Sequence, residues 1–156
     1  TKYRIESANY LLKLKKKLNL NCTNLILFNH DSRHRNKKFL IPRLVSAFKK
    51  NDYKFIRSIY KSNIKMDFSH ADDICYAIYL LIKKNKNPNN LILSSGKITS
   101  INKLIEKYIH KNYLKKIEYN NSQISIIGNN YKAKKLLNWK LNKNVFDAAK
   151  EIYISK

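Results

Sequence analysis

Apolar and polar residues follow one another along the chain in blocks that predict helices and strands by turns. Over residues 3–19, apolar residues recur at helical spacing while lysines cover the opposite side, which predicts an amphipathic helix. In SHADDICYAIYLLIKK (69–84), acids open the segment and lysines close it, an order that suits the helix dipole. Four more helices are predicted over residues 40–50, 101–109 (with Ser100 as N-cap), 131–140 and 145–154.

Short unbroken apolar runs between these segments predict buried strands. The clearest are CTNLILFN (22–29) and NLILSS (90–95), and weaker ones are FIRSIY (55–60), IKMDF (64–68), KIEYN (116–120) and ISIIGN (124–129). Strands that alternate with helices predict an α/β fold with a partly parallel sheet. The 156 residues suffice for one domain with a substantial core.

The chain is very basic, with 33 Lys and Arg against 10 Asp and Glu and a net charge of +23. Such a charge is typical of nucleic-acid binding, yet the lysines are spread over every segment and no recognition motif accompanies them. We therefore expect no nucleic-acid partner. No apolar run reaches the roughly 18 residues that a membrane helix needs, so we expect a cytoplasmic protein without membrane contact. Cys22 and Cys75 lack metal-ligand spacing and are expected as reduced core thiols.

Candidate chemistry gathers where the run 22–29 ends. Asn29 and His30 close it, and a loop with Arg33, His34, Arg35 and two lysines follows. Ligands of open α/β sheets bind beyond the carboxyl ends of strands, and an amide suits hydroxyl and phosphate oxygens because it both donates and accepts. The alternatives are a strand-end cap for Asn29 and a charged turn in a basic chain. No Gly-rich phosphate loop is present.

Four collinear segments resemble the C-terminal half of extended short-chain dehydrogenases/reductases that modify nucleotide sugars, most of all the GDP-mannose 4,6-dehydratase family. They are LILFNHDS with FLIPRL, KMDFSHADDICYAIYLLI, ILSSGKITSINKLIE and IIGNNYKAKKLLNWK. The resemblance implies a partial Rossmann-like parallel sheet plus a small α/β substrate-binding subdomain, without the N-terminal nucleotide-binding half. Residues 1–156 then form one partial domain, in which about 1–30 end the Rossmann-like part and about 31–156 are mostly substrate-binding.

The family's catalytic motif is a helical Tyr-x-x-x-Lys, to which the resemblance matches YRIES. Tyr3 takes the place of the catalytic tyrosine, but Ser7 stands where the family has lysine. A hydroxyl supplies no positive charge with which to lower the phenol pKa, so base activation is lost. The alternative for Tyr3 is an exposed tyrosine without a catalytic role.

The remaining site residues are also implied by the resemblance. Asn29 and Arg43 correspond to substrate-binding positions, and His30 and Arg35 to cofactor-binding positions; no metal ligand is expected. Arg43 could equally be a solvated arginine on a helix face, and His30 a structural histidine. Met66 stands where the family has an arginine that binds the diphosphate, and a thioether cannot pair with phosphate.

The resemblance thus implies the substrate-binding half of an NAD(P)-dependent nucleotide-sugar 4,6-dehydratase of the GDP-mannose type, incomplete or catalytically impaired by itself. A complete relative would use NADP or NAD, and we expect this chain alone to bind neither. The expected partners are the nucleotide sugar and either an N-terminal half or further copies of the chain. The alternative is a non-catalytic descendant of the family that serves as a binding or assembly module.

Overall fold

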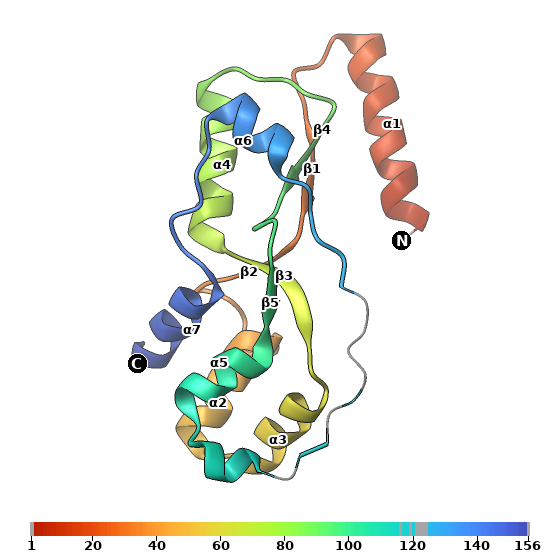
Figure 1. The fold of residues 1–156 in the computed structure, drawn as a ribbon. Coiled ribbons are helices and arrows are strands. Elements are labelled where there is room, and N and C mark those ends of the chain that lie inside the picture. Colours follow the sequence, from red (N-terminus) through yellow and green to blue (C-terminus); the bar gives the residue numbers. More distant parts are fainter. Residues whose placement is uncertain (1, 116, 119, 121–124, 156) are drawn as a thin grey trace.

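The computed structural model describes residues 2–115, 117–118, 120 and 125–155. Figure 1 shows an elongated body with two small sheets near its middle, helices at both ends, and the first helix standing apart. Two groups of elements, each with its own buried cluster, make up this body.

The first group, here called the β1–β4 end, is built around two parallel strands. Leu25 lies opposite Leu91, and the two strands pack against the fourth and sixth helices. Trp139 is buried in this cluster and donates its indole N–H to the carbonyl of Asp73, 3.0 Å away. The elements are α1 (Lys2–Leu18), β1 (Asn24–Leu27), α4 (Ala71–Lys83), β4 (Asn90–Leu93) and α6 (Tyr131–Leu137).

The second group, the β2–β3–β5 end, has one parallel and one antiparallel strand pair. Asp31 lies opposite His70 in the parallel pair, and Met66 opposite Thr99 in the antiparallel one. Helices enclose the larger core at this end, which contains Leu44 and Leu104 without solvent exposure. The elements are β2 (Asn29–Asp31), α2 (Leu40–Lys50), α3 (Tyr53–Lys61), β3 (Lys65–His70), β5 (Ile98–Ser100), α5 (Ile101–Tyr108), η1 (Lys111–Leu114) and α7 (Val145–Ile154).

All six predicted helices are confirmed within a few residues, and so are the strands predicted over 22–29, 64–68 and 90–95. Ser100 does occupy the N-cap position of α5, although its side chain makes no capping hydrogen bond. The strand predicted over 55–60 is wrong, because this segment lies within α3. Asp52 begins that helix by accepting the N–H of Phe55 at 3.1 Å, which a strand could not offer.

The strand predicted over 124–129 is also wrong where the structure describes it, because residues 125–129 belong to no strand. Their backbone is bound by side chains instead: Gly128 donates to Asp67 and accepts from Ser94. The strand predicted over 116–120 is wrong where the structure describes it, because residues 117, 118 and 120 belong to no strand, while residues 116 and 119 lie outside the described residues. The expectation of two core thiols is wrong for Cys75, which is exposed on α4, while Cys22 is half-buried.

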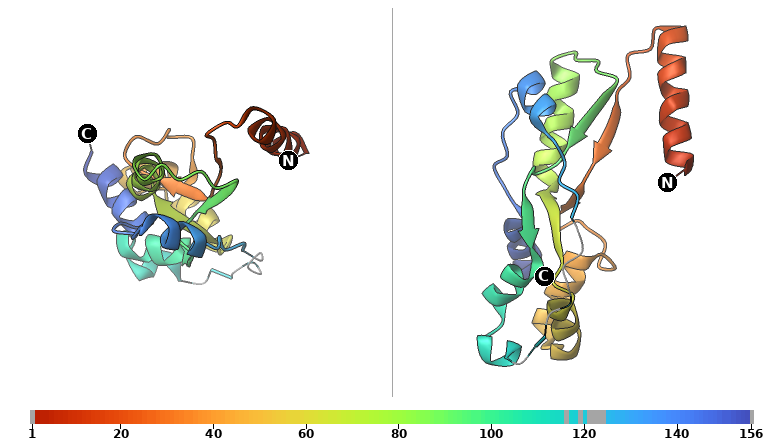
Figure 2. Two further views of the ribbon diagram at one scale, coloured as in Figure 1. Left: turned by 90° about the horizontal axis from the view of Figure 1, so that it is seen from above. Right: turned by 45° about the vertical axis from the view of Figure 1, so that its right-hand side comes forward.

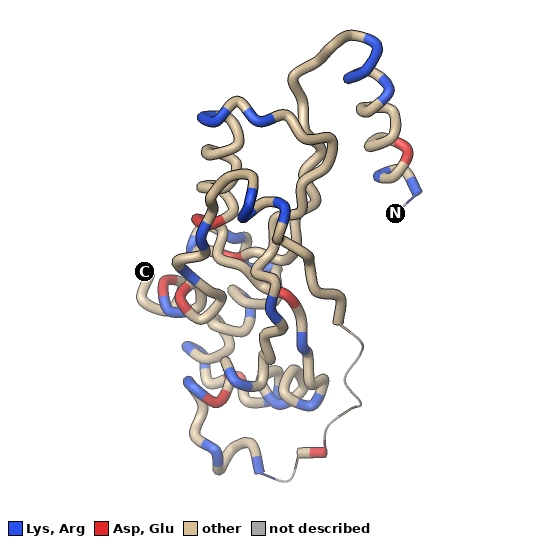
Figure 3. Tube along the Cα trace, turned by 45° about the horizontal axis from the view of Figure 1, so that its top comes forward, with Lys and Arg blue, Asp and Glu red and all other residues tan. Residues whose placement is uncertain are grey.

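Basic residues are distributed over the whole body rather than on one surface. Figure 3 shows Lys and Arg on α1, on the loops beside β4 and on the helices of the opposite end, with few acids between them. This spread of charge marks no single face for an extended polyanion.

Among the described helices, none combines the length and the apolar character needed to cross a bilayer.

Candidate functional site

Asn29 lies where the chain passes from one sheet to the other. It follows the carboxyl end of β1 and begins β2, so the expected position just beyond a strand end is realised. The exposed side chain points over β3, with its Nδ2 atom 3.4 Å from the carbonyl of Asp67 and 3.8 Å from the sulfur of Met66. The thioether, which the resemblance matches to an arginine of the family, thus lies directly beside the amide.

His30 is half-buried and fixed by a local hydrogen bond. Its Nδ1 atom lies 2.8 Å from the carbonyl of Phe28, so Nδ1 carries the proton and donates it. This hydrogen bond orients the imidazole at the junction of β1 and β2 and is compatible with a structural role.

A basic cavity follows β2. Its volume is about 370 Å³, and it lies between the 33–37 loop, α2 and the end of α7. None of the described residues that line it is acidic, so it favours an anionic group. The lining residues are Arg33, His34, Arg35, Lys37, Pro42, Val45, Ser46, Lys49, Ile152 and Ser155.

Arg35 is held in this cavity from two sides. Its guanidinium lies 3.6 Å from the centre of the Phe39 ring, and its Nε atom lies 3.8 Å from the Oδ1 atom of Asp31. Asp31 is only 6% exposed, and burial raises the pKa of its carboxyl, whereas the nearby charges of Arg35 and His30 act in the opposite direction. A stacked, paired guanidinium is restricted before any ligand binds.

Arg43 does not join this cavity. It is exposed on α2, where its guanidinium lies 4.4 Å from the centre of the Phe55 ring, and it is absent from the cavity lining. The α2 residues that do line the cavity, among them Ser46 and Lys49, lie on another face of the helix. The structure therefore does not bring the two arginines named by the resemblance into one pocket.

Tyr3 lies far along the chain from these residues, at the beginning of α1, and is 80% exposed. Ser7, which the resemblance matches to the family's lysine, donates its hydroxyl hydrogen to the carbonyl of Tyr3 at 2.8 Å. Its side chain is therefore bonded to the backbone of its own helix. Both residues line a groove between α1 and β1, a different cavity from that of Arg35.

The sequence reasoning missed the role of Asp67, a carboxylate that is 1% exposed at the centre of the molecule. It accepts from the backbone N–H of Ser95 (2.9 Å), Gly96 (3.0 Å) and Gly128 (3.1 Å), and from the hydroxyl of Ser95 (2.6 Å). One carboxylate thereby fixes β3, the turn after β4 and the segment before α6. The sequence did contain a signal for this role. Asp67 is an acid inside the extended run IKMDF, where an unpaired buried charge would be costly.

Both glycines of the chain serve this arrangement. A Cβ atom at Gly128 would lie 2.4 Å from the hydroxyl oxygen of Ser94 and 2.8 Å from the ring of Phe28. Gly96 has a φ of +71°, and a Cβ there would meet the amide of Asn130 at 3.0 Å. These positions require glycine for close backbone packing around Asp67, not for a phosphate-binding turn.

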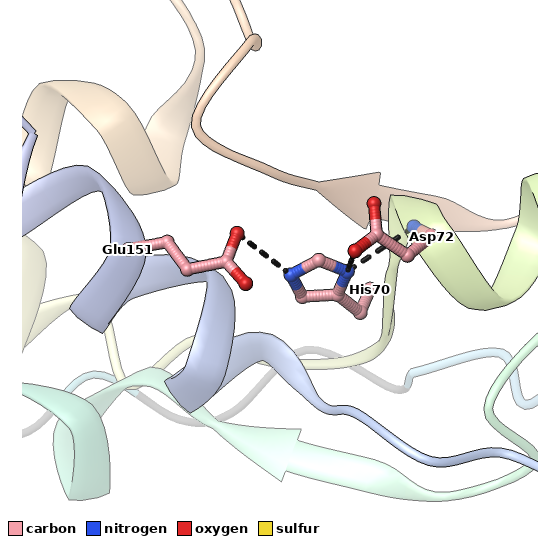
Figure 4. A group of neighbouring side chains, drawn as sticks. All are labelled: His70, Asp72 and Glu151. Atoms are coloured by element: carbon pink, nitrogen blue, oxygen red, sulfur yellow. Dashed lines mark hydrogen bonds and ion pairs between the residues drawn. The ribbon is translucent and has the colours of Figure 1, made fainter.

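A second cluster joins α4 to α7 (Figure 4). The buried His70 accepts the N–H of Asp72 at its Nδ1 atom, and its Nε2 atom lies 3.3 Å from Glu151. His70, Asp72 and Glu151 have a geometry compatible with a metal ion. However, the ammonium of Lys143 lies 2.7 Å from Asp72 and 2.8 Å from Glu151, so a cation of the chain already pairs with both carboxylates. We assign no metal here.

Comparison with known proteins agrees with this architecture. A sequence model of the family described as GDP-mannose 4,6 dehydratase matches residues 7–152. The GDP-mannose 4,6 dehydratase of Dictyostelium discoideum is 28% identical over 160 residues, covering 83% of this chain and 44% of that protein. The chain thus spans less than half the length of this relative.

Solved structures of nucleotide-sugar enzymes share the fold. A UDP-glucose 4-epimerase from Thermotoga maritima, solved with UDP-glucose, has a TM-score of 0.70 and 17% identity and covers 96% of this chain and 50% of its own. A dTDP-glucose 4,6-dehydratase from Bacillus anthracis, in complex with NAD, has a TM-score of 0.68 and 16% identity, covering 91% of this chain and 46% of its own. At this identity the likeness establishes the fold.

Proposed function

Because the chain belongs to the GDP-mannose 4,6-dehydratase family, whose model matches residues 7–152, we propose that it forms the substrate-binding half of a nucleotide-sugar 4,6-dehydratase of the GDP-mannose type. The predicted fold class, part of an extended short-chain dehydrogenase/reductase, is confirmed. The division at about residue 30 remains a prediction. The activity, the substrate and the partners are proposals, since complete relatives are about twice as long.

The basic cavity beside β2 carries this proposal. It combines three guanidinium or imidazole groups with two ammonium groups and no acid among its described lining residues. A nucleotide diphosphate is the anionic part of such a substrate. We assign Arg35 to it, rather than to the cofactor phosphate that the resemblance implies, because a guanidinium can bind two phosphate oxygens at once. Asn29 begins β2, the strand that precedes this cavity, and its exposed amide can bond to a sugar hydroxyl.

The described residues do not fit a nicotinamide dinucleotide by themselves. A pyrophosphate requires a glycine-rich turn at a helix N-terminus so that the backbone can approach closely. The chain has two glycines, and both are packed around Asp67. The solved relatives include an enzyme in complex with NAD, so the cofactor belongs to complete family members.

Binding of GDP-mannose to the chain tests the proposal by isothermal titration calorimetry. Arg35→Ala should weaken binding roughly 10- to 100-fold, because a hydrogen bond to a charged group contributes about 1.5–3 kcal/mol. Lys84→Ala, which removes an exposed ammonium at the far end of α4, should leave the affinity unchanged. Absence of binding by the parent chain, or equal losses in both variants, would contradict the proposal.

Two observations favour the second candidate, a non-catalytic descendant of the family. Ser7 bonds to Tyr3 rather than supplying a charge, and Met66 lies beside Asn29 in place of an arginine. This candidate predicts that Ser7→Lys, in a chain joined to a nucleotide-binding half from a relative, produces no 4-keto sugar from GDP-mannose. Turnover that appears with lysine at this position and is absent with Ser7→Met would exclude it, because only the ammonium can lower the phenol pKa.

A further inference from the structure

We propose that Asp31 is the positioning residue of the basic cavity: as a carboxylate it holds the guanidinium of Arg35, and it takes up a proton when a diphosphate binds that guanidinium. The inference rests on the proposed function, since it adds proton uptake to the binding of a nucleotide sugar in the same cavity. It predicts that the affinity for the diphosphate increases as the pH falls.

The carboxyl group of Asp31 is buried at the end of β2. The residue is 6% exposed and lies opposite His70 in the register of β2 and β3. Its Oδ1 atom lies 3.8 Å from the Nε atom of Arg35, which exceeds the length of an N–H···O hydrogen bond. Neither of these two buried atoms has a hydrogen-bond partner among the described residues. Charge attraction therefore holds the pair together without using the N–H groups of the guanidinium.

Arg35 is presented to the cavity with these N–H groups available. It belongs to the loop after β2, which projects from the side of the body in Figure 2 before the chain enters α2. The guanidinium lies 3.6 Å from the centre of the Phe39 ring, and the side chain stays 33% exposed. No described residue accepts a hydrogen bond from the guanidinium, so its two Nη groups can bind two phosphate oxygens at once.

A bound diphosphate sets the ligand and the carboxylate in competition for one guanidinium. Burial raises the pKa of the Asp31 carboxyl, while the charges of Arg35 and His30 act to lower it. A diphosphate that pairs with Arg35 weakens that lowering effect and adds negative charge close to the carboxylate, so the pKa should rise further. One carboxylate oxygen of Asp31 then accepts a proton from the solvent, and the group becomes a neutral acid.

Other titratable and charged groups surround this pair. They are His30 and His70 on the two strands, Arg33 and His34 on the loop, Asp72 on α4 and Glu151 on α7. His70 and the two acids contact one another, and the ammonium of Lys143 pairs with both acids, so their charges are balanced within that cluster. His34 lines the cavity, where an imidazole that gains a charge in acid attracts an anion. Substitutions therefore have to separate Asp31 from His34.

GDP-mannose is a suitable probe, because both of its phosphates are esterified and its diphosphate keeps the same charge between pH 7.5 and pH 5.0. By calorimetry, His34→Gln should bind it roughly 3- to 10-fold more tightly at pH 5.0, since a tenfold difference in affinity corresponds to a difference of one in the carboxyl pKa between the free and bound states. Adding Asp31→Asn should abolish this gain. The amide imitates the neutral acid, so this double variant should bind at pH 7.5 about as tightly as His34→Gln does at pH 5.0. A merely structural aspartate would instead give weaker binding at both pH values.

The carboxyl ¹³C resonance of Asp31 gives a second measurement, which needs no substitution. Its titration midpoint in the parent chain should move to higher pH when GDP-mannose is added. UDP-glucose, which also carries a doubly esterified diphosphate, tests the same step with another base and sugar.

The outcomes separate this inference from the proposed function. If GDP-mannose binds while the midpoint stays in place, or if the gain in acid survives Asp31→Asn in the His34→Gln chain, the inference is overturned and the proposed function stands. A midpoint that rises with UDP-glucose, together with no binding of GDP-mannose, would overturn the proposed function alone. Absence of binding of either nucleotide sugar would overturn both.

Discussion

The two ends of the molecule differ in how completely they bury their own apolar surface. At the β2–β3–β5 end, helices enclose the strands, and residues such as Leu44 and Leu104 have no exposed surface. At the β1–β4 end, one side of the sheet is covered by α4 and α6, while the edge facing α1 is open and Ile26 and Leu27 are 42% and 43% exposed. The β2–β3–β5 end therefore buries its apolar side chains within the chain, whereas the β1–β4 end leaves some of them exposed to solvent.

This difference in burial predicts which substitutions should affect the stability of the isolated chain and which should not. Residues that hold the chain folded should lie in the two buried clusters and around Asp67, since a closely packed interior is sensitive to each lost methylene. Residues of the α1–β1 groove should matter little to the isolated chain, because they make few contacts there.

Truncation of a core leucine should cost far more than the same change on α1. Leu104→Ala should lower the free energy of unfolding by about 2–5 kcal/mol, the range found for buried leucines. Ile5→Ala, at a position 57% exposed, should change it by less than about 0.5 kcal/mol. Urea unfolding followed by circular dichroism measures both. A cost at Ile5 comparable to that at Leu104 would mean that α1 belongs to the core.

Neutralising Asp67 should be nearly as costly as losing a core leucine. Asp67→Asn replaces a buried charged acceptor of four hydrogen bonds by a neutral amide, and should lower the free energy of unfolding by roughly 3 kcal/mol. Asp52→Asn is the matched control, because an exposed asparagine caps α3 about as well as aspartate. If the two substitutions cost the same in urea unfolding, Asp67 does not organise the junction.

The cluster between α4 and α7 should give the smallest effect and should act through pH. Hydrogen bonds from Lys143 hold the pKa values of Asp72 and Glu151 below their ordinary values of 3.8 and 4.5. Groups with a lowered folded-state pKa stabilise the fold above their unfolded pKa and lose that contribution as pH falls through the folded pKa. The chain should therefore lose stability below about pH 4.5, and Lys143→Met should reduce that loss.

Urea midpoints at pH 7 and pH 3 measure this effect in the parent and in Lys143→Met. Burial raises the pKa of Asp31, which acts in the opposite direction, but Asp31 is the same in both proteins and cancels in the comparison. Lys84→Met is the control, since this exposed lysine lies at the far end of α4. An acid-induced loss of equal size in all three proteins would show that Lys143 does not pair with the two carboxylates in solution.

Much of the fold could be predicted from local patterns, and the errors have local causes. The helix over 71–83 combines apolar periodicity with acids at its beginning, so independent signals agree. The segment FIRSIY is a short apolar run whose periodicity alone fits either a strand or a helix. Asp52 before it was the signal for a helix. Residues 125–129 read as a strand by composition, yet their backbone is bound by Asp67 and Ser94, which no local pattern contains.

The site could be predicted less fully, because it depends on which residues meet in space. Resemblance and spacing named Asn29 and Arg35 as candidates, and the structure places Asn29 on β2 and Arg35 in the loop that follows it. It does not bring Arg43 or Tyr3 to the cavity of Arg35. Arg43 lies on another face of α2, and Tyr3 lines the separate groove between α1 and β1. The partners of Asp67 come from segments 28 to 61 residues away, which spacing along the chain could not reveal.

Amide hydrogen exchange along β1 measures whether the edge of β1 that faces away from β4 is unpaired in the isolated chain. In the isolated chain, the N–H of Ile26, which faces β4, should exchange slowly, and those of Leu25 and Leu27 rapidly. Slow exchange at all three positions in the isolated chain would contradict the account.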